Sequence, residues 1–131
     1  MTKIIVDTSF SMLELGKKDI LQMVIKSIID DFKRKNIEFS IIDFEGKNVD
    51  FTNISLKDTV FNKNIINEND IVLTDGLLEL EKTQANVMAI GVDSDIDNLK
   101  ENFKNVFVID EIFTLLSLYE NNKKQIEDDE W

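Results

Sequence analysis

Three side chains with hard oxygen atoms follow the first apolar segment at alternate positions: Asp7, Ser9 and Ser11. Alternate residues of an extended loop point to the same side, so the two serine hydroxyls can join the Asp7 carboxylate. This donor set carries little negative charge and suits Mg²⁺, which keeps several waters and leaves a position open for an outside oxygen. The spacing predicts a divalent metal site, with Mn²⁺ or Ca²⁺ as the other hard ions that it could hold.

A second carboxylate, Asp75, follows the apolar segment 71–74 and precedes Gly76. Ligands of open parallel sheets bind beyond the carboxyl ends of the strands, where the strand order reverses. If the strands before Asp7 and Asp75 are neighbours, the two carboxylates converge there. A simpler alternative stays open: Asp7 and Ser9 cap a helix, and Asp75 with Gly76 forms a turn.

Composition excludes much enzyme chemistry. The sequence has no Cys and no His, which rules out thiolate and imidazole metal ligands, Ser-His-Asp triads and histidine bases. The net charge of −11, from 26 acidic and 15 basic residues, repels phosphate backbones, so we expect no nucleic-acid partner.

The chain begins with Met1, Thr2 and Lys3 and then enters a strand-like pattern without the features of a signal peptide. None of its apolar runs approaches the ~20 residues that span a bilayer. We therefore expect a cytoplasmic protein without membrane contact. The oligomeric state is not predicted.

Strand-like and helical segments alternate along the chain. Apolar residues recur with helical spacing over residues 17–35, and further helices are predicted over 95–103 and 111–119, with a helical turn at 77–82. Strand-like segments span residues 3–6, 37–44, 48–52, 70–74, 86–92 and 106–109. Because Gly46 lies in a short connection, residues 37–52 predict a hairpin. The pattern predicts a three-layer α/β/α fold whose mainly parallel sheet has one antiparallel edge strand at residues 48–52.

Two regions of organisation are expected. Residues 1–120 have the length and patterning of a single domain, while residues 121–131 form an acidic C-terminal tail that ends in Trp131. We interpret the tail as a solvating segment, with a partner-binding peptide as the alternative.

The sequence resembles the von Willebrand factor A domains, whose metal-ion-dependent adhesion site uses Asp-x-Ser-x-Ser after the first strand. Asp7, Ser9 and Ser11 match that motif in full. The family's Thr-Asp-Gly and Ala-Ile-Gly-Val stretches are matched by residues 74–76 and 89–92, so the resemblance covers about residues 3–119. It implies a metal site in which Asp75 also takes part.

The resemblance also implies a threonine ligand from a loop before Asp75, usually in a glycine-rich setting followed by a helix. This sequence departs there, because it lacks such a glycine and has only 15 residues between Thr59 and Asp75. Thr59 is the first choice for this ligand and Thr52 the second.

Another acidic stretch, Asp93 to Asp97, looks like a calcium loop but lacks the Gly and Glu that an EF-hand needs at its sixth and twelfth positions, where Asn98 and Lys104 stand. We expect Asp95 or Asp97 to cap the helix that follows.

These features favour a non-enzymatic adaptor, in which the metal at Asp7, Ser9, Ser11, Thr59 and Asp75 bridges to an Asp or Glu of a protein partner. One alternative is a metal-dependent nuclease similar to PIN domains, with Asp75, Asp93 and Asp95 as further carboxylates. Three features disfavour a nuclease: the predicted hairpin, the Gly that follows Asp75 and the net negative charge. The other alternative is a metal-free scaffold subunit of a larger assembly.

Overall fold

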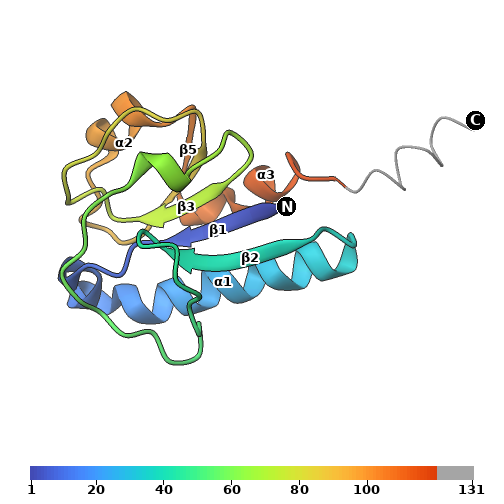
Figure 1. Cartoon of the computed structure of the whole chain (residues 1–131), viewed down its shortest axis with the longest axis horizontal. Coiled ribbons are helices and arrows are strands. Elements are labelled where there is room, and N and C mark those ends of the chain that lie inside the picture. The colour runs from blue at the N-terminus through green and yellow to red at the C-terminus, as the bar shows by residue number, and fades with distance from the viewer. Residues whose placement is uncertain (121–131) are drawn as a thin grey trace, which may run out of the picture.

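The computed structural model describes residues 1–120, in which strands and helices alternate (Figure 1). The strands are β1 (Thr2–Val6), β2 (Phe39–Asp43), β3 (Ile71–Thr74), β4 (Asn86–Ala89) and β5 (Asn105–Phe107). The α-helices are α1 (Lys17–Arg34), α2 (Ile96–Asn102) and α3 (Ile112–Leu116). Short 3-10 helices are η1 (Phe10–Gly16), η2 (Lys63–Ile65) and η3 (Ile109–Glu111).

The five strands of the described residues form one parallel sheet in the order β2-β1-β3-β4-β5. The chain crosses from β2 over β1 to β3, so the strand order reverses between β1 and β3. Val6 pairs with Leu73, and the Asp7 N–H donates to the Leu73 carbonyl at 2.9 Å. The ends of β1 and β3 therefore lie side by side at the position where doubly wound sheets bind ligands.

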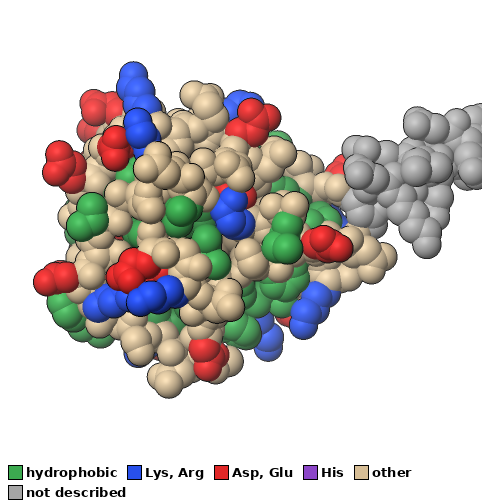
Figure 2. Space-filling model, viewed as in Figure 1, with side chains coloured by type: hydrophobic (Ala, Val, Ile, Leu, Met, Phe, Trp, Pro, Cys, Tyr) green, Lys and Arg blue, Asp and Glu red, His purple; other side chains and the backbone are tan. Residues whose placement is uncertain are grey.

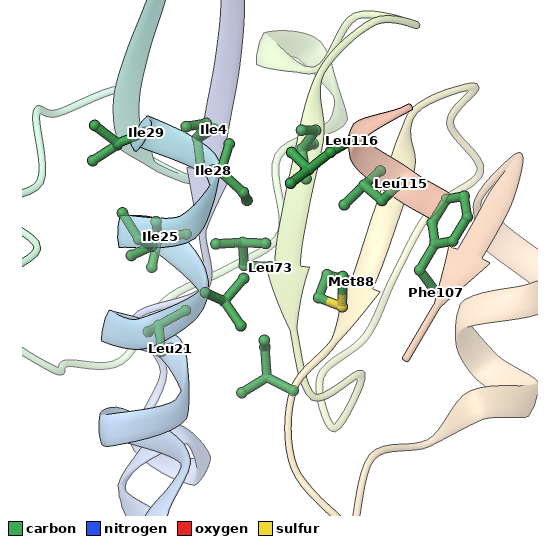
Figure 3. Packing of buried hydrophobic residues seen from close by; sticks show 14 of the residues in the cluster. Ile4, Leu21, Ile25, Ile28, Ile29, Leu73, Met88, Phe107, Leu115 and Leu116 are labelled. Atoms are coloured by element: carbon green, nitrogen blue, oxygen red, sulfur yellow. The ribbon is translucent and has the colours of Figure 1, made fainter. Parts of the chain in front are cut away.

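Helices cover both faces of the sheet, because the central strands are apolar on both sides. On one face, α1 and α3 pack against β1, β3 and β4 (Figure 3). Its buried residues include Leu21, Ile25, Ile28, Leu115 and Leu116 from the helices and Ile4, Leu73 and Met88 from the strands. On the other face, Leu99 of α2 packs with Ile5, Val72 and Val87. The predicted α/β fold, with helices on both faces of a parallel sheet, is confirmed.

The predicted antiparallel edge strand at residues 48–52 is wrong. The hairpin begins as expected, since Asn48 bridges antiparallel to Ile42 and the Val49 N–H donates to the Ile41 carbonyl at 3.0 Å. The pairing then stops at Asp50, whose carboxylate accepts from the backbone N–H and the hydroxyl of Thr52. Such local side-chain bonds compete with a strand ladder and turn the chain away.

The predicted helical turn at residues 77–82 is also wrong. The Asn98 side-chain amide donates to the backbone carbonyls of Gly76 and Leu78, at 2.9 and 3.3 Å. These carbonyls are thus bonded to α2, and the segment stays irregular.

The acidic tail predicted at residues 121–131 lies outside the described residues. Within residues 1–120, no helix is long and apolar enough to cross a membrane.

Candidate functional site

Asp7 lies at the end of β1 and is fully buried. Its Oδ1 accepts the Ser9 backbone N–H at 2.9 Å, and its Oδ2 accepts the Thr74 hydroxyl at 2.6 Å. Burial raises the pKa of Asp7 above its usual value, and the nearby charge of Asp75 adds to this, although the bonds from Thr74 and Ser9 oppose it. The hydrogen bonds to Asp7 therefore do not fully offset the cost of burying its negative charge, and a cation beside it would be favourable.

Ser9 lies beside Asp7 and Ser11 lies beside Ser9, but Ser11 belongs to η1, so the loop after Asp7 is not extended as the alternation assumes. The hydroxyl oxygens of Ser9 and Ser11 are 3.2 Å apart, and both residues are partly exposed. The turn that places them is held by the bond from Ser9 to Asp7 and by the Met12 N–H, which donates to the Ser9 carbonyl at 3.0 Å. Two hydroxyls and one carboxylate therefore lie near one another beyond the end of β1, where the strand order reverses.

Asp75 is buried and directly follows β3, the strand that pairs with β1. Its Oδ1 accepts the Leu77 backbone N–H at 3.0 Å, and its Oδ2 accepts the ammonium of Lys17 at 3.0 Å. The strands before Asp7 and Asp75 are neighbours, and the charge of Asp75 is near enough to raise the pKa of Asp7, but the ammonium of Lys17 already contacts Asp75.

Lys17 begins α1 and is fully buried. Its Nζ also donates to Asp93 Oδ2 at 2.8 Å, so one ammonium joins the loops that follow β3 and β4. Burial lowers the pKa of Lys17, but the hydrogen bonds and negative charges of Asp93 and Asp75 outweigh it and leave that pKa above its usual value. Lys17 therefore stays charged and acts as the counter-ion of these carboxylates.

Gly91 makes room for the Lys17 side chain. A Cβ at position 91 would lie 2.6 Å from Lys17 Cδ and 3.0 Å from Asp93 Oδ1, and the φ of Gly91 is +97°. Both the contact and the backbone conformation require glycine here. The resemblance to the Ala-Ile-Gly-Val stretch thus includes a residue that positions the internal cation.

The threonine predicted to complete the site is not linked to it. Thr59 lines a separate hollow with Phe44 and Phe61, and its buried hydroxyl has no hydrogen-bond partner among residues 1–120. Thr52, the second choice, is exposed and bonds to Asp50. The threonine that contacts Asp7 is Thr74, the residue before Asp75.

The acidic stretch after β4 divides into two roles. Asp93 bonds to Lys17, whereas Asp95 caps α2, since its side chain accepts the Asn98 backbone N–H at 3.1 Å. The prediction that Asp95 or Asp97 caps this helix is confirmed for Asp95.

The donor set fits a hard divalent ion only in part. Asp7, Ser9 and Ser11 supply oxygens of the right kind, but Asp75 is bonded to Lys17. Within residues 1–120, no group of three or more acidic side chains is arranged to hold a metal. Any ion at this edge would therefore depend on Asp7, the two serine hydroxyls, water and an outside ligand.

Sequence reasoning missed Lys17, although a signal was available. Lys17 stands four residues before Leu21 on the same face of α1, where every turn places a buried side chain. A lysine on the buried face of an amphipathic helix needs a carboxylate partner.

Comparisons with protein-family models, with curated proteins and with solved structures give no match to this chain.

Proposed function

We propose that this chain is a non-enzymatic protein-interaction module similar to the von Willebrand factor A domains. In this proposal, a divalent ion, Mg²⁺ in the first place, binds at Asp7, Ser9 and Ser11 and bridges to an Asp or Glu of a protein partner. The observation that carries the proposal is the buried, under-compensated Asp7 carboxylate with two serine hydroxyls at the switch point of the sheet.

The roles within the site differ from those that the resemblance alone implies. Asp7, Ser9 and Ser11 are the residues available for direct contact with an ion. Asp75 would act from further away, since Lys17 holds one of its oxygens and the Leu77 backbone N–H bonds to the other. Thr74 orients Asp7 through its hydroxyl. When bound, the ion would supply a positive charge for an outside carboxylate.

A binding role is supported over nuclease chemistry by the use of the other carboxylates. Lys17 already neutralises Asp93 through one of its oxygens, and Asp95 caps α2, which disfavours a second metal ion shared by these carboxylates and Asp7. PIN nucleases are usually helical in the corresponding segment, whereas residues 37–52 of this chain contain β2 and a turn.

A metal-free scaffold is a second candidate, favoured by one observation. The Lys17 ammonium lies 3.0 Å from Asp75 and 2.8 Å from Asp93, so the protein already carries a cation at this edge. In this case the site would stabilise the fold and would not need an ion to bind a partner.

The test is thermal unfolding of the wild-type chain in Mg²⁺ and in a chelator. An ion that binds only the folded state at 100 times its Kd stabilises it by about 2.7 kcal/mol. We expect millimolar Mg²⁺ to raise the Tm of the wild type, and Asp7→Asn to remove this response.

Two comparisons sharpen the test. The pKa of folded Asp7 is raised, so its ionisation destabilises the fold as pH rises through that pKa, and Asp7→Asn should be at least as stable as the wild type in chelator. Asp95→Ala loses a helix cap worth about 1 kcal/mol but should keep the Mg²⁺ response. A wild type that shows no Mg²⁺ response, even with a partner carboxylate such as millimolar acetate, would favour the metal-free scaffold.

A further inference from the structure

Large apolar side chains are exposed in the loops that follow four neighbouring strands. We define the edge surface by these six residues: Phe10, Leu13 and Leu15 in η1 after β1, Leu77 after β3, Val92 after β4 and Val108 after β5. Because adjacent strands lie about 4.8 Å apart, the loops at their carboxyl ends are side by side. Figure 2 shows apolar, acidic and basic side chains on its left side, where β1, β2 and β3 end in Figure 1.

The edge surface contains a hollow of about 220 Å³. Its apolar lining comes from the start of α1 and from the loops after β4 and β5, and includes Ile20, Val92, Val108 and Ile109. Val92 is 92% exposed, although it directly follows Gly91, which packs against Lys17. The hollow therefore lies beside the buried ion pairs and is open to a side chain from outside.

Leu15 is exposed and has a strained backbone conformation. Its φ is +54° and its ψ +35°, a left-handed conformation that is unfavourable for a leucine, and its side chain is 64% exposed. Nothing in the core requires a leucine here, since the buried residue of η1 is Met12. Backbone strain at an exposed apolar residue points to a role in binding.

Acidic side chains predominate in the loops that carry the edge surface. In residues 7–16, 75–80, 90–95 and 108–111, every ionisable side chain is acidic. Basic residues also contact these loops: Lys17 is buried between Asp75 and Asp93, and Lys57, whose backbone N–H donates to the Thr8 carbonyl, pairs with Glu45. A surface that is both apolar and acidic is complementary to one that is both apolar and basic.

We propose that the edge surface binds a basic amphipathic helix of a protein partner. A large apolar side chain of that helix would enter the hollow beside Val92, Leu15 would pack on its apolar face, and its Lys or Arg residues would lie over the acidic loops. This goes beyond the proposed metal bridge, because the contact uses no ion and involves other residues than Asp7, Ser9 and Ser11.

The probe is a synthetic 18-residue helical peptide with leucines on one face and lysines on the other, titrated in 150 mM salt with a chelator. A second peptide carries glutamates in place of the lysines. We expect the lysine peptide to bind the wild type and the glutamate peptide not to bind. Leu15→Gly and Val92→Ser should each weaken binding about tenfold, the size expected of residues that anchor an interface.

The matched control is Met23→Gln, which removes another exposed apolar side chain, on α1, and should leave binding within about twofold. Leu15→Gly should at the same time raise the Tm, because glycine adopts the left-handed conformation without strain. Lower affinity with higher stability separates a binding role of Leu15 from a folding role. Failure of the lysine peptide to bind, or equal binding to all the variants, would overturn the proposal. Because a chelator is present throughout, failure of the metal bridge would not affect this result.

Discussion

At the scale of single residues, Lys17 decides how much of the edge is open to a divalent ion. Its ammonium neutralises Asp75 and Asp93 but does not hydrogen-bond to Asp7 within the described chain. An ion would therefore meet two hydroxyls and one carboxylate that lacks a counter-ion among the described residues, and it would need an outside oxygen to bind tightly. This arrangement suits a site that is completed by its partner.

Replacing Lys17 should change stability and ion binding in opposite directions. Lys17→Gln leaves Asp75 buried without its counter-ion, and breaking such a pair costs about 3–5 kcal/mol. The same change frees an Asp75 oxygen, so Mg²⁺ should restore part of the loss and raise the Tm more than in the wild type. Unfolding scans in chelator and in Mg²⁺ measure both effects, and an equal Mg²⁺ response in the two proteins would place the ion away from Asp75.

At the scale of elements, the sequence predicts the parts whose signal is local. Helix α1 and strands β1 and β3 follow from apolar periodicity, which spans only a few residues. The edge strand fails because the Asp50 side chain ends the pairing after one bridge. The Lys17 pairs could not be predicted from spacing, since their partners are 58 and 76 residues away in the chain.

The residues of the candidate site also differ in whether a local signal could predict their position. Asp7, Ser9 and Ser11 are close in the sequence, so a local pattern could place them near one another, although Ser11 lies in the helical turn of η1 and not in an extended loop. Asp75 was predictable because parallel neighbours end at the same edge. The choice of Thr59 had no local signal behind it, and the hydroxyl at Asp7 comes from Thr74.

The packing of Gly91, in the loop after β4, can be tested by comparison with Gly46, which follows β2. Gly91 and Gly46 both have positive φ, but an added Cβ at Gly91 meets the side chains of Lys17 and Asp93, whereas one at Gly46 meets none. We expect Gly46→Ala to cost about 1 kcal/mol from backbone strain, and Gly91→Ala to cost at least twice as much. Urea unfolding gives the two free energies, and equal values would mean that the Lys17 side chain moves aside without loss.

At the scale of the whole molecule, two buried groups make the fold sensitive to alkaline pH. Burial raises the pKa of Tyr119 to about 12, helped by the charge of Asp70 and opposed by a hydrogen bond from Asn86. The pKa of Lys17 is also raised in the folded state. For both groups the folded state holds the proton more tightly, so their stabilisation is complete below the unfolded pKa and is lost as pH rises through the folded one.

We therefore expect stability to fall steeply between about pH 10 and pH 12. Tyr119→Phe should be less stable at pH 8, because Asn86 and the Asn69 carbonyl lose their partner, but its stability should fall less between pH 10 and pH 12, by roughly 2–3 kcal/mol. Urea unfolding at fixed pH values measures this difference. Parallel curves for the two proteins would show that Tyr119 does not titrate in this range.

The most direct test of the proposed ion site is a titration of the ¹⁵N-labelled protein with Mn²⁺, a paramagnetic ion that broadens the amide signals of nearby residues. We expect broadening centred on Asp7, Ser9, Ser11 and Gly76 that is displaced by Mg²⁺ and absent in Asp7→Asn. Broadening confined to the exposed acidic residues around Asp95 and Asp97, or unchanged in Asp7→Asn, would rule out an ion site at Asp7.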